Sequence, residues 1–300
     1  MRVNYSYIEE FFKILSGQAA IKDIQHNTAF KIISAHANKF ENDFSLHKLE
    51  KVINKKSEEI FGFKDFFKNR GAILNLINLM KEKEGEWLKE VQESIRCLFP
   101  KTEFKDITIY PVIGYDIGIG INKAVCINVN TEIFLNNFKE LISTTIHETA
   151  HVMYEKYHGP IRGLNEIDSF HSMKEFLDYY IHYEGTGIFA AKKFRIKNRL
   201  LNSGTPIQED YLLLSNKDMT FKLLNEYRSL VDDLKHNKVH SIYEFLERGF
   251  GRSRLTHRLG FAIFDAINRK YGIEEVQKAI VLPSEKFMKK YLSILEQEKA

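Results

Sequence analysis

Apolar residues recur at helical spacing along most of the chain. In the first hundred residues this pattern predicts helices over Tyr7–Leu15, Leu46–Ile60 and 72–98, the last of them broken or bent near Gly85. After residue 135 it predicts seven more helices, at 136–157, 172–197, 208–235, 241–249, 255–270, 273–280 and 284–297. Prolines fall in the gaps between these later segments, as helix breakers should.

The pattern changes between residues 106 and 130, where apolar residues alternate and glycine is frequent. Alternating and β-branched residues predict two or three short strands. Ile107–Val112 is one and Ala124–Val129 is another, with GYDIGIG between them. This linking segment is not a GxGxxG motif that opens a helix, so it does not indicate nucleotide binding. We therefore expect an α+β fold that is mostly helical, with a small mixed sheet. A helical N-terminal region at 1–102 precedes a second domain at 103–300.

Composition narrows the class of protein. With 300 residues, 44% hydrophobic and 28% charged, the chain is expected to be globular rather than disordered. A net charge of +4 does not indicate a nucleic-acid partner, and two cysteines are too few for a disulfide framework. Charged residues interrupt the apolar N-terminal segment, and no apolar run is long enough to span a membrane. We expect a cytoplasmic protein without a membrane span; no oligomeric state follows from these features.

The segment 141–154, LISTTIHETAHVMY, contains an HExxH motif formed by His147, Glu148 and His151. Residues four apart lie on one face of a helix, so both imidazoles can reach one metal ion. Glu148 lies about 100° around the helix from His147, where its carboxylate can reach a water on that metal without ligating it. Two histidine ligands, an open coordination position and a neighbouring base are what hydrolysis by zinc requires.

The surroundings of the motif strengthen this interpretation. Glu148 is the only formally charged residue among these fourteen positions, and the helix is apolar nearly all round, which is typical of a buried helix. An unpaired buried carboxylate would cost several kcal/mol, and a metal with its water gives a reason for it. The alternative is a buried helix whose histidines hydrogen-bond to core groups.

The HExxH segment resembles the zinc-binding helix of the zincin metallopeptidases. The resemblance is strong over about fifteen residues and looser over roughly 105–270, and it implies that 103–300 is a zincin-like metallopeptidase domain. The metzincin pattern requires glycine at position 154 and histidine at 157, where this chain has Tyr154 and Tyr157. The remaining pattern, that of the gluzincins, places a glutamate ligand on a later helix.

Glu184 is the expected third ligand. Acidic and histidine residues downstream of the motif include Glu155, Glu166, His171, Glu175, Asp178, His182 and Glu184. Of these, Glu184 lies on the apolar stripe of the predicted helix 172–197, where a carboxylate should be paired or metal-bound. The string YEGTGIFAA also resembles the Glu-Gly motif that carries the third ligand in gluzincin-like peptidases. Glu166 and His171 are the alternative ligands, and a buried ion pair with an arginine is the alternative without metal.

One departure from the gluzincin pattern concerns the residues that support the metal ligands. Some gluzincins have an acidic residue four positions after the ligand, where this chain has Ile188. The partners that orient the metal ligands are therefore left unassigned by the sequence.

The resemblance also gives a role to the strand before the motif. In zincins this strand is a sheet edge along which extended peptide binds, and Ala124–Val129 is expected to act in this way by β-strand addition. A plain structural strand is the alternative.

The arginine-rich segment 248–267 is a candidate for stabilising the oxyanion of peptide hydrolysis. Predicted peptidases of the gluzincin-like clan carry a Gly-Tyr-x-x-Gly element on a late helix, which resembles Thr256–Gly260 with His257 in place of tyrosine. Tyr243 and Tyr271 are alternatives to His257, and a solvated basic face or a phosphate site is the simpler interpretation of the arginines.

These observations predict a zinc-dependent peptidase of gluzincin type that acts on peptides or proteins. One Zn²⁺ per chain is held by His147, His151 and Glu184, Glu148 is the general base, and His257 or a nearby arginine steadies the oxyanion. The alternatives are a catalytically inactive zincin-fold module that binds a peptide or protein, and a nucleic-acid-binding or regulatory helical protein that uses the basic cluster at 248–258.

Overall fold

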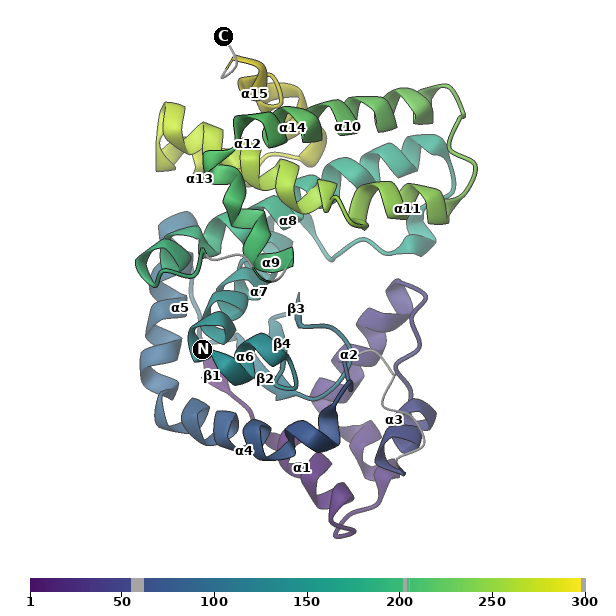
Figure 1. The fold of residues 1–300 in the computed structure, drawn as a ribbon, viewed down its shortest axis with the longest axis vertical. Coiled ribbons are helices and arrows are strands. Elements are labelled where there is room, and N and C mark those ends of the chain that lie inside the picture. The colour runs from purple at the N-terminus through teal and green to yellow at the C-terminus, as the bar shows by residue number, and fades with distance from the viewer. Residues whose placement is uncertain (55–61, 202–203, 205, 298–300) are drawn as a thin grey trace. The chain divides into compact units, whose positions relative to one another are not determined.

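The computed structural model describes residues 1–54, 62–201, 204 and 206–297 (Figure 1). The described chain is mostly helical and contains one small sheet, as the sequence predicted. The α-helices are α1 (Ser6–Leu15), α2 (Thr28–Lys39), α3 (Leu46–Ile53), α4 (Phe66–Glu82), α5 (Glu84–Leu98), α6 (Glu132–Asn136), α7 (Phe138–His158), α8 (Phe170–Lys197), α9 (Pro206–Glu209), α10 (Lys217–Lys235), α11 (Ile242–Phe250), α12 (Leu255–Tyr271), α13 (Ile273–Ile280), α14 (Ser284–Tyr291) and α15 (Ile294–Gln297).

Two compact units make up the chain. One comprises residues 1–93 and 101–152, and the other comprises 94–100 and 153–300. Helices α5 and α7 each contribute residues to both units. The expected domain boundary at residue 102 stays a prediction.

The first unit contains the sheet, whose strand order is β1-β2-β4-β3. Its strands are β1 (Arg2–Val3), β2 (Thr108–Val112), β3 (Gly118–Ile121) and β4 (Ala124–Asn128). Strands β1 and β2 are parallel, as are β2 and β4, whereas β3 is antiparallel to β4, so the sheet is mixed as expected.

The expectation that the strand at 124–129 is an edge strand is wrong, because β4 pairs with β2 on one side and with β3 on the other. The reason is a two-residue turn at Asn122 and Lys123, whose φ angles of 50° and 64° are those of a tight hairpin. This turn folds Gly118–Ile121 back onto β4. As a result β3, and not β4, is the edge strand on this side of the described sheet.

Buried side chains hold α7 in the first unit. The Trp87 indole of α5 donates a hydrogen bond to the Thr145 hydroxyl of α7 at 3.3 Å, and both residues are fully buried. The hydroxyls of Thr145 and Thr149 donate in turn to carbonyl oxygens one helical turn earlier, at 2.8 and 2.7 Å. These threonines can therefore lie in an apolar core without unsatisfied polar groups.

The second unit is built on α8 and α12, which pack along each other (Figure 1). Their closest approach is at Gly185 and Gly260. A Cβ atom on Gly260 would lie 1.9 Å from the carbonyl oxygen of Ile181 and 2.8 Å from the Cα of Gly185. Only glycine allows two helix backbones to come this close, so these two residues set the geometry of the unit.

Several expected helices differ in their bounds. The segment 208–235 is not one helix: a 3-10 turn covers Asp210–Ser215, and α10 begins after Asn216, whose side chain accepts a hydrogen bond from the Met219 N–H. The expected break near Gly85 is confirmed, since α4 ends at Glu82 and α5 begins at Glu84. The segment 284–297 is divided between α14 and α15. Of the expected Leu46–Ile60 helix, α3 covers the part up to Ile53, and residues 55–60 lie outside the described residues.

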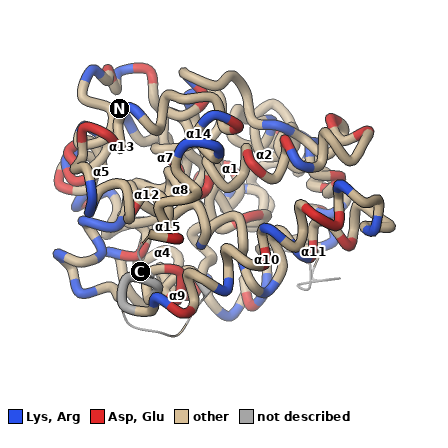
Figure 2. Tube along the Cα trace, turned by 90° about the horizontal axis from the view of Figure 1, so that it is seen from above, with Lys and Arg blue, Asp and Glu red and all other residues tan. Residues whose placement is uncertain are grey.

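Charges of both signs are interspersed along the helices. Figure 2 shows lysine and arginine alternating with aspartate and glutamate along α10 and α11. Within the described residues, none of the helices is both long enough and apolar enough to cross a membrane.

Candidate metal centre

His147 and His151 lie on one face of α7, one turn apart, as the HExxH spacing predicted. Their Nε2 atoms are 2.8 Å apart and their rings are nearly perpendicular, with centroids 4.5 Å apart. His151 is buried and His147 is half-buried. The two imidazoles therefore present the same nitrogen to one point beside the helix, which is what two ligands of one metal ion must do.

Glu148 is buried beside the two histidines, with only 8% of its surface exposed. Its Oε1 lies 3.9 Å from Nε2 of His147. The neighbouring thiol of Cys126 on β4 has a raised pKa because it is buried and, to a lesser degree, because it lies near the Glu148 carboxylate. Cys126 is therefore a neutral neighbour of this site.

Two glycines of β3 lie directly against this part of α7. A Cβ on Gly118 would lie 2.8 Å from Cγ and Oε1 of Glu148. A Cβ on Gly120 would lie 2.0 Å from the Glu148 carbonyl oxygen and 3.0 Å from Cβ of His151. Sequence reasoning missed this role, although glycine inside a strand was the available signal, since it often marks a close backbone approach.

Glu184 lies on α8, where its side chain is 14% exposed. Its Oε2 is 3.3 Å from Nε2 of His257 on α12, whose side chain is 16% exposed. The expected alternative for Glu184 was a buried ion pair with an arginine. In the structure the side chain in direct contact with Glu184 is a histidine, and Arg254 is attracted electrostatically to the same carboxylate. The close contact of Gly185 and Gly260 brings α8 and α12 together.

The other candidate ligands have different partners. Glu166 accepts a hydrogen bond from the Gly163 N–H at 2.8 Å, and His171 is 82% exposed and lies 3.4 Å from Glu175. Asp178 accepts a hydrogen bond from the Tyr227 hydroxyl and pairs with Lys174. These contacts account for the downstream residues that the sequence left open, apart from Glu155 and His182.

Glu155 and His182 also have structural partners. Glu155 accepts a hydrogen bond from the Ile161 N–H at 3.1 Å. The Tyr154 hydroxyl near the end of α7 lies 2.9 Å from Nδ1 of His182 on α8 and 3.1 Å from the Ser284 hydroxyl. Burial lowers the pKa of His182 well below its usual 6.5, so its ring is neutral, with one nitrogen a donor and the other an acceptor. This cluster of Tyr154, His182 and Ser284 holds α8 against the last turns of α7. The contact lies at His182, two residues before Glu184.

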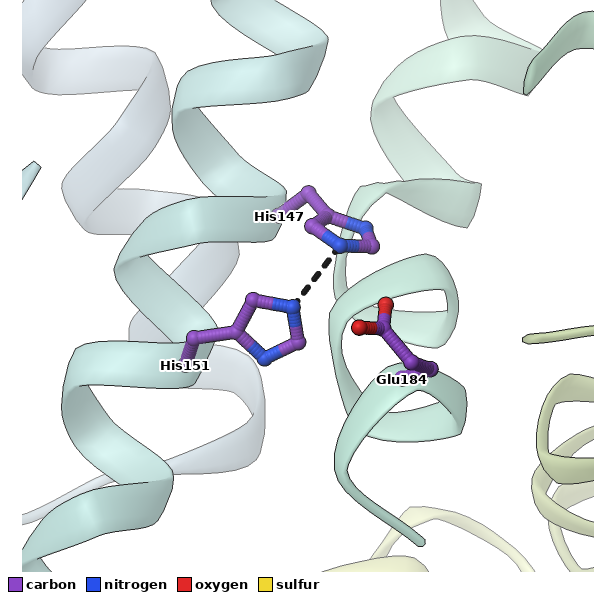
Figure 3. A group of neighbouring side chains, drawn as sticks. All are labelled: His147, His151 and Glu184. Carbon is purple, nitrogen blue, oxygen red and sulfur yellow. Dashed lines mark hydrogen bonds between the residues drawn. The ribbon is translucent and has the colours of Figure 1, made fainter. Parts of the chain in front are cut away.

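Within the described residues, one group could hold a metal ion, and it consists of His147, His151 and Glu184 (Figure 3). One ligand atom of each lies within 4.8 Å of those of the other two. Two neutral imidazoles and one carboxylate are a known donor set for catalytic zinc, so the chemistry of the residues fits this ion.

The arginine-rich segment is engaged in ion pairs. Arg254 and Arg258 both bind the carboxylate of Asp210, which is 1% exposed. Arg248 binds Asp233 at 2.8 Å. These contacts commit three of the arginines to carboxylates of the chain itself.

The candidates for oxyanion stabilisation differ in exposure. Tyr243 and Tyr271, the alternatives to His257, are 76% and 52% exposed. His257 is mostly buried and lies beside Glu184. The oxyanion role of His257 stays a prediction.

Comparison with known proteins identifies a family for this chain. The model of a family described as "Putative zinc dependent peptidase (DUF5700)" matches residues 8–300. No curated protein and no solved structure matches the chain. The match includes the N-terminal helices as well as α7 and α8, and it confirms the predicted class of zinc peptidase at the level of the family.

Proposed function

Because the chain belongs to this zinc-dependent peptidase family, we propose that it is a gluzincin-type zincin with one Zn²⁺ bound by His147, His151 and Glu184. The observation that carries the proposal is the convergence of these three side chains in Figure 3. Zinc bound in such a site supplies a Lewis acid and an activated water, whose pKa falls toward about 7.

Glu148 is the general base in this proposal. Its carboxylate is buried next to His147, and Gly118 leaves the space that it occupies. Glu148 takes a proton from the attacking water and later delivers it to the amine that leaves. The close approach of β3 limits the positions open to this side chain, which favours one orientation for proton transfer.

Peptide is proposed to bind along β3 rather than β4. In zincins the substrate extends the sheet at the edge nearest the active helix, and in this chain β3 is the terminal strand on that side. Its residues Gly118 and Gly120 lie against Glu148, so a peptide added to β3 would pass beside the proposed base. Endopeptidase and exopeptidase activities both agree with this arrangement.

An inactive peptide-binding module would have the same fold and the same zinc ligands, and it differs only in the absence of turnover. The nucleic-acid alternative loses its main support, since Arg254 and Arg258 bind Asp210.

Zinc content tests the proposed ligands. Purified full chain is stripped with a chelator, reconstituted with zinc and measured by mass spectrometry, for the wild type and for His147→Ala and Glu184→Ala. We expect one zinc per chain in the wild type and strongly reduced zinc in both variants. Glu166→Ala is the matched control, because this carboxylate caps a backbone N–H, and it should retain zinc. Full zinc in Glu184→Ala would contradict the proposed third ligand.

A further inference from the structure

The contact between His257 and Glu184 leads to an inference that rests on the proposed zinc site. We infer that His257 is a positioning residue: its Nε2–H holds Oε2 of Glu184, which fixes the carboxylate and leaves its other oxygen to the metal. This assigns a partner to the third ligand, for which the sequence offered none. Metal ligands of this kind are usually oriented by a second hydrogen-bonding group.

The helix crossing explains why the two side chains meet. Gly185 follows Glu184 directly on α8, and Gly260 lies three residues after His257 on α12. A Cβ on Gly185 would lie 2.4 Å from the carbonyl carbon of Gly260, so the two backbones are in contact here. One turn along α12 from this contact, the longer side chain of His257 spans the distance to Glu184.

The partners of the two ring nitrogens of His257 indicate that Nε2 carries a proton and that this proton faces Glu184. Nδ1 lies 3.1 Å from the hydroxyl of Thr256, which can also donate to the Gly249 carbonyl oxygen at 3.3 Å. A carboxylate only accepts hydrogen bonds, so Nε2 must carry the proton that faces it. The Thr256 hydroxyl satisfies Nδ1 as a donor or as an acceptor, and the ring is held in place from both sides.

The surroundings favour a strong contact. Both side chains are mostly buried, and a hydrogen bond to a carboxylate strengthens where water is excluded. Arg254 and Arg258 form their ion pairs with Asp210, and Arg254 is also attracted electrostatically to Glu184. His257 is the basic side chain in direct contact with Glu184, with its Nε2 3.3 Å from Oε2.

The positioning role competes with the oxyanion role. An oxyanion donor would need the Nε2–H of His257, because Nδ1 lies against Thr256. The same N–H faces Glu184 in the structure. One proton cannot serve both acceptors well, so the two roles predict different effects of removing the imidazole.

Zinc affinity distinguishes the roles without a substrate. The dissociation constant of zinc is measured on the full chain by competition with a chromophoric chelator. We expect His257→Ala to weaken zinc binding by about 10- to 100-fold, the usual effect of losing such a partner. His257→Gln keeps an N–H at a similar reach and should recover most of the affinity. The free energy of unfolding of the zinc-free proteins is measured as a control for lost stability. It should be similar in His257→Ala and His257→Gln.

A double variant separates this inference from the zinc site itself. If Glu184 is a ligand and His257 acts through it, His257→Ala should cause no further loss of affinity in a Glu184→Ala background. Unchanged zinc affinity in His257→Ala, beside reduced affinity in Glu184→Ala, would overturn the positioning role and leave the zinc site intact. Unchanged affinity in Glu184→Ala would instead overturn the proposed site. Equal losses in His257→Ala and His257→Gln would also contradict the inference.

Discussion

Gly118 and Gly120 contact different parts of α7, although they are two residues apart on one strand. A Cβ on Gly118 would meet the side chain of Glu148, whereas a Cβ on Gly120 would meet the backbone of α7. The first residue therefore controls where the proposed base lies, and the second controls how closely the helix packs on β3. A methyl group at each position separates the two effects.

Gly118→Ala should impair hydrolysis and spare zinc. The added methyl group displaces the Glu148 carboxylate, and a shift of about 1 Å in a catalytic group can cost about 100-fold in rate. Zinc content should remain that of the wild type, because the three atoms nearest the added methyl group all belong to Glu148 and not to a proposed zinc ligand. The measurement is peptide hydrolysis by zinc-loaded protein, with Gly71→Ala on α4 as control, since a Cβ there meets nothing within 4 Å. Unimpaired hydrolysis in Gly118→Ala would contradict the role of this glycine.

Local patterns in the sequence predicted the contacts of a site residue where they arise within one helix, and not where they arise between two helices. The histidines of the HExxH motif come together because residues four apart share a helix face, which is a local property. Glu184 was predicted from the apolar stripe around it and from a resemblance. The contact of His257 with Glu184 depends on two helices crossing at Gly185 and Gly260, and no local pattern encodes that pairing.

At the scale of elements, the crossing of α8 and α12 is the contact most sensitive to volume. Gly260→Ala forces the helices apart, because the new Cβ would lie 1.9 Å from the Ile181 carbonyl oxygen. We expect a loss in the free energy of unfolding of at least about 1–3 kcal/mol, the usual cost of overpacking.

Gly249→Ala on α11 is the matched control for this loss, because its Cβ would make an ordinary contact of 3.6 Å with Leu177. Alanine is favoured over glycine in helices by up to about 1 kcal/mol, so this variant should be neutral or stabilised. Denaturant unfolding measures both variants, and equal stability in the two would contradict the close crossing.

The carboxylate of Glu275 links α13 to α14 and predicts a pH dependence of stability. Hydrogen bonds from Lys290, Tyr291 and Lys278 hold its pKa at about 2, below the ordinary 4.5. Because its pKa is lower in the folded protein than in the unfolded chain, the ionised Glu275 carboxylate stabilises the fold above pH 4.5. This stabilisation is lost as the pH falls toward about 2.

Glu275→Gln should therefore lower the free energy of unfolding at neutral pH, and the difference from the wild type should shrink as the pH falls through this window. Urea unfolding at a series of pH values measures it. A difference that does not change with pH would show that the charge of Glu275 contributes nothing.

Element bounds were less predictable than element types. A third strand was allowed for but not placed, because the turn that follows β3, Asn122-Lys123, lacks the glycine that usually marks a two-residue hairpin. The expected helix 208–235 is interrupted because the Asn216 side chain caps the start of a new helix. The apolar pattern continues through Asn216 and therefore does not show this boundary.

At the scale of the whole molecule, the mostly helical fold with a small mixed sheet followed from patterning alone. Membership of a zinc-dependent peptidase family agrees with what the HExxH motif predicted. Strand order could not be predicted in the same way, because pairing of β1 with β2 joins residues more than a hundred positions apart. Long-range pairing of this kind leaves no periodic signal in the sequence.

The most direct test of the whole account is peptide hydrolysis by the zinc-loaded wild type beside Glu148→Gln, measured on a fluorogenic peptide library. Glutamine keeps the size of the side chain and cannot take the proton, so zinc content should be equal in the two proteins. We expect the wild type to cleave peptides and the variant to lose about 10²- to 10⁴-fold in rate. Equal hydrolysis by the two proteins would contradict the proposed mechanism, and a zinc-loaded wild type that binds peptides without cleaving them would contradict the assignment as a peptidase.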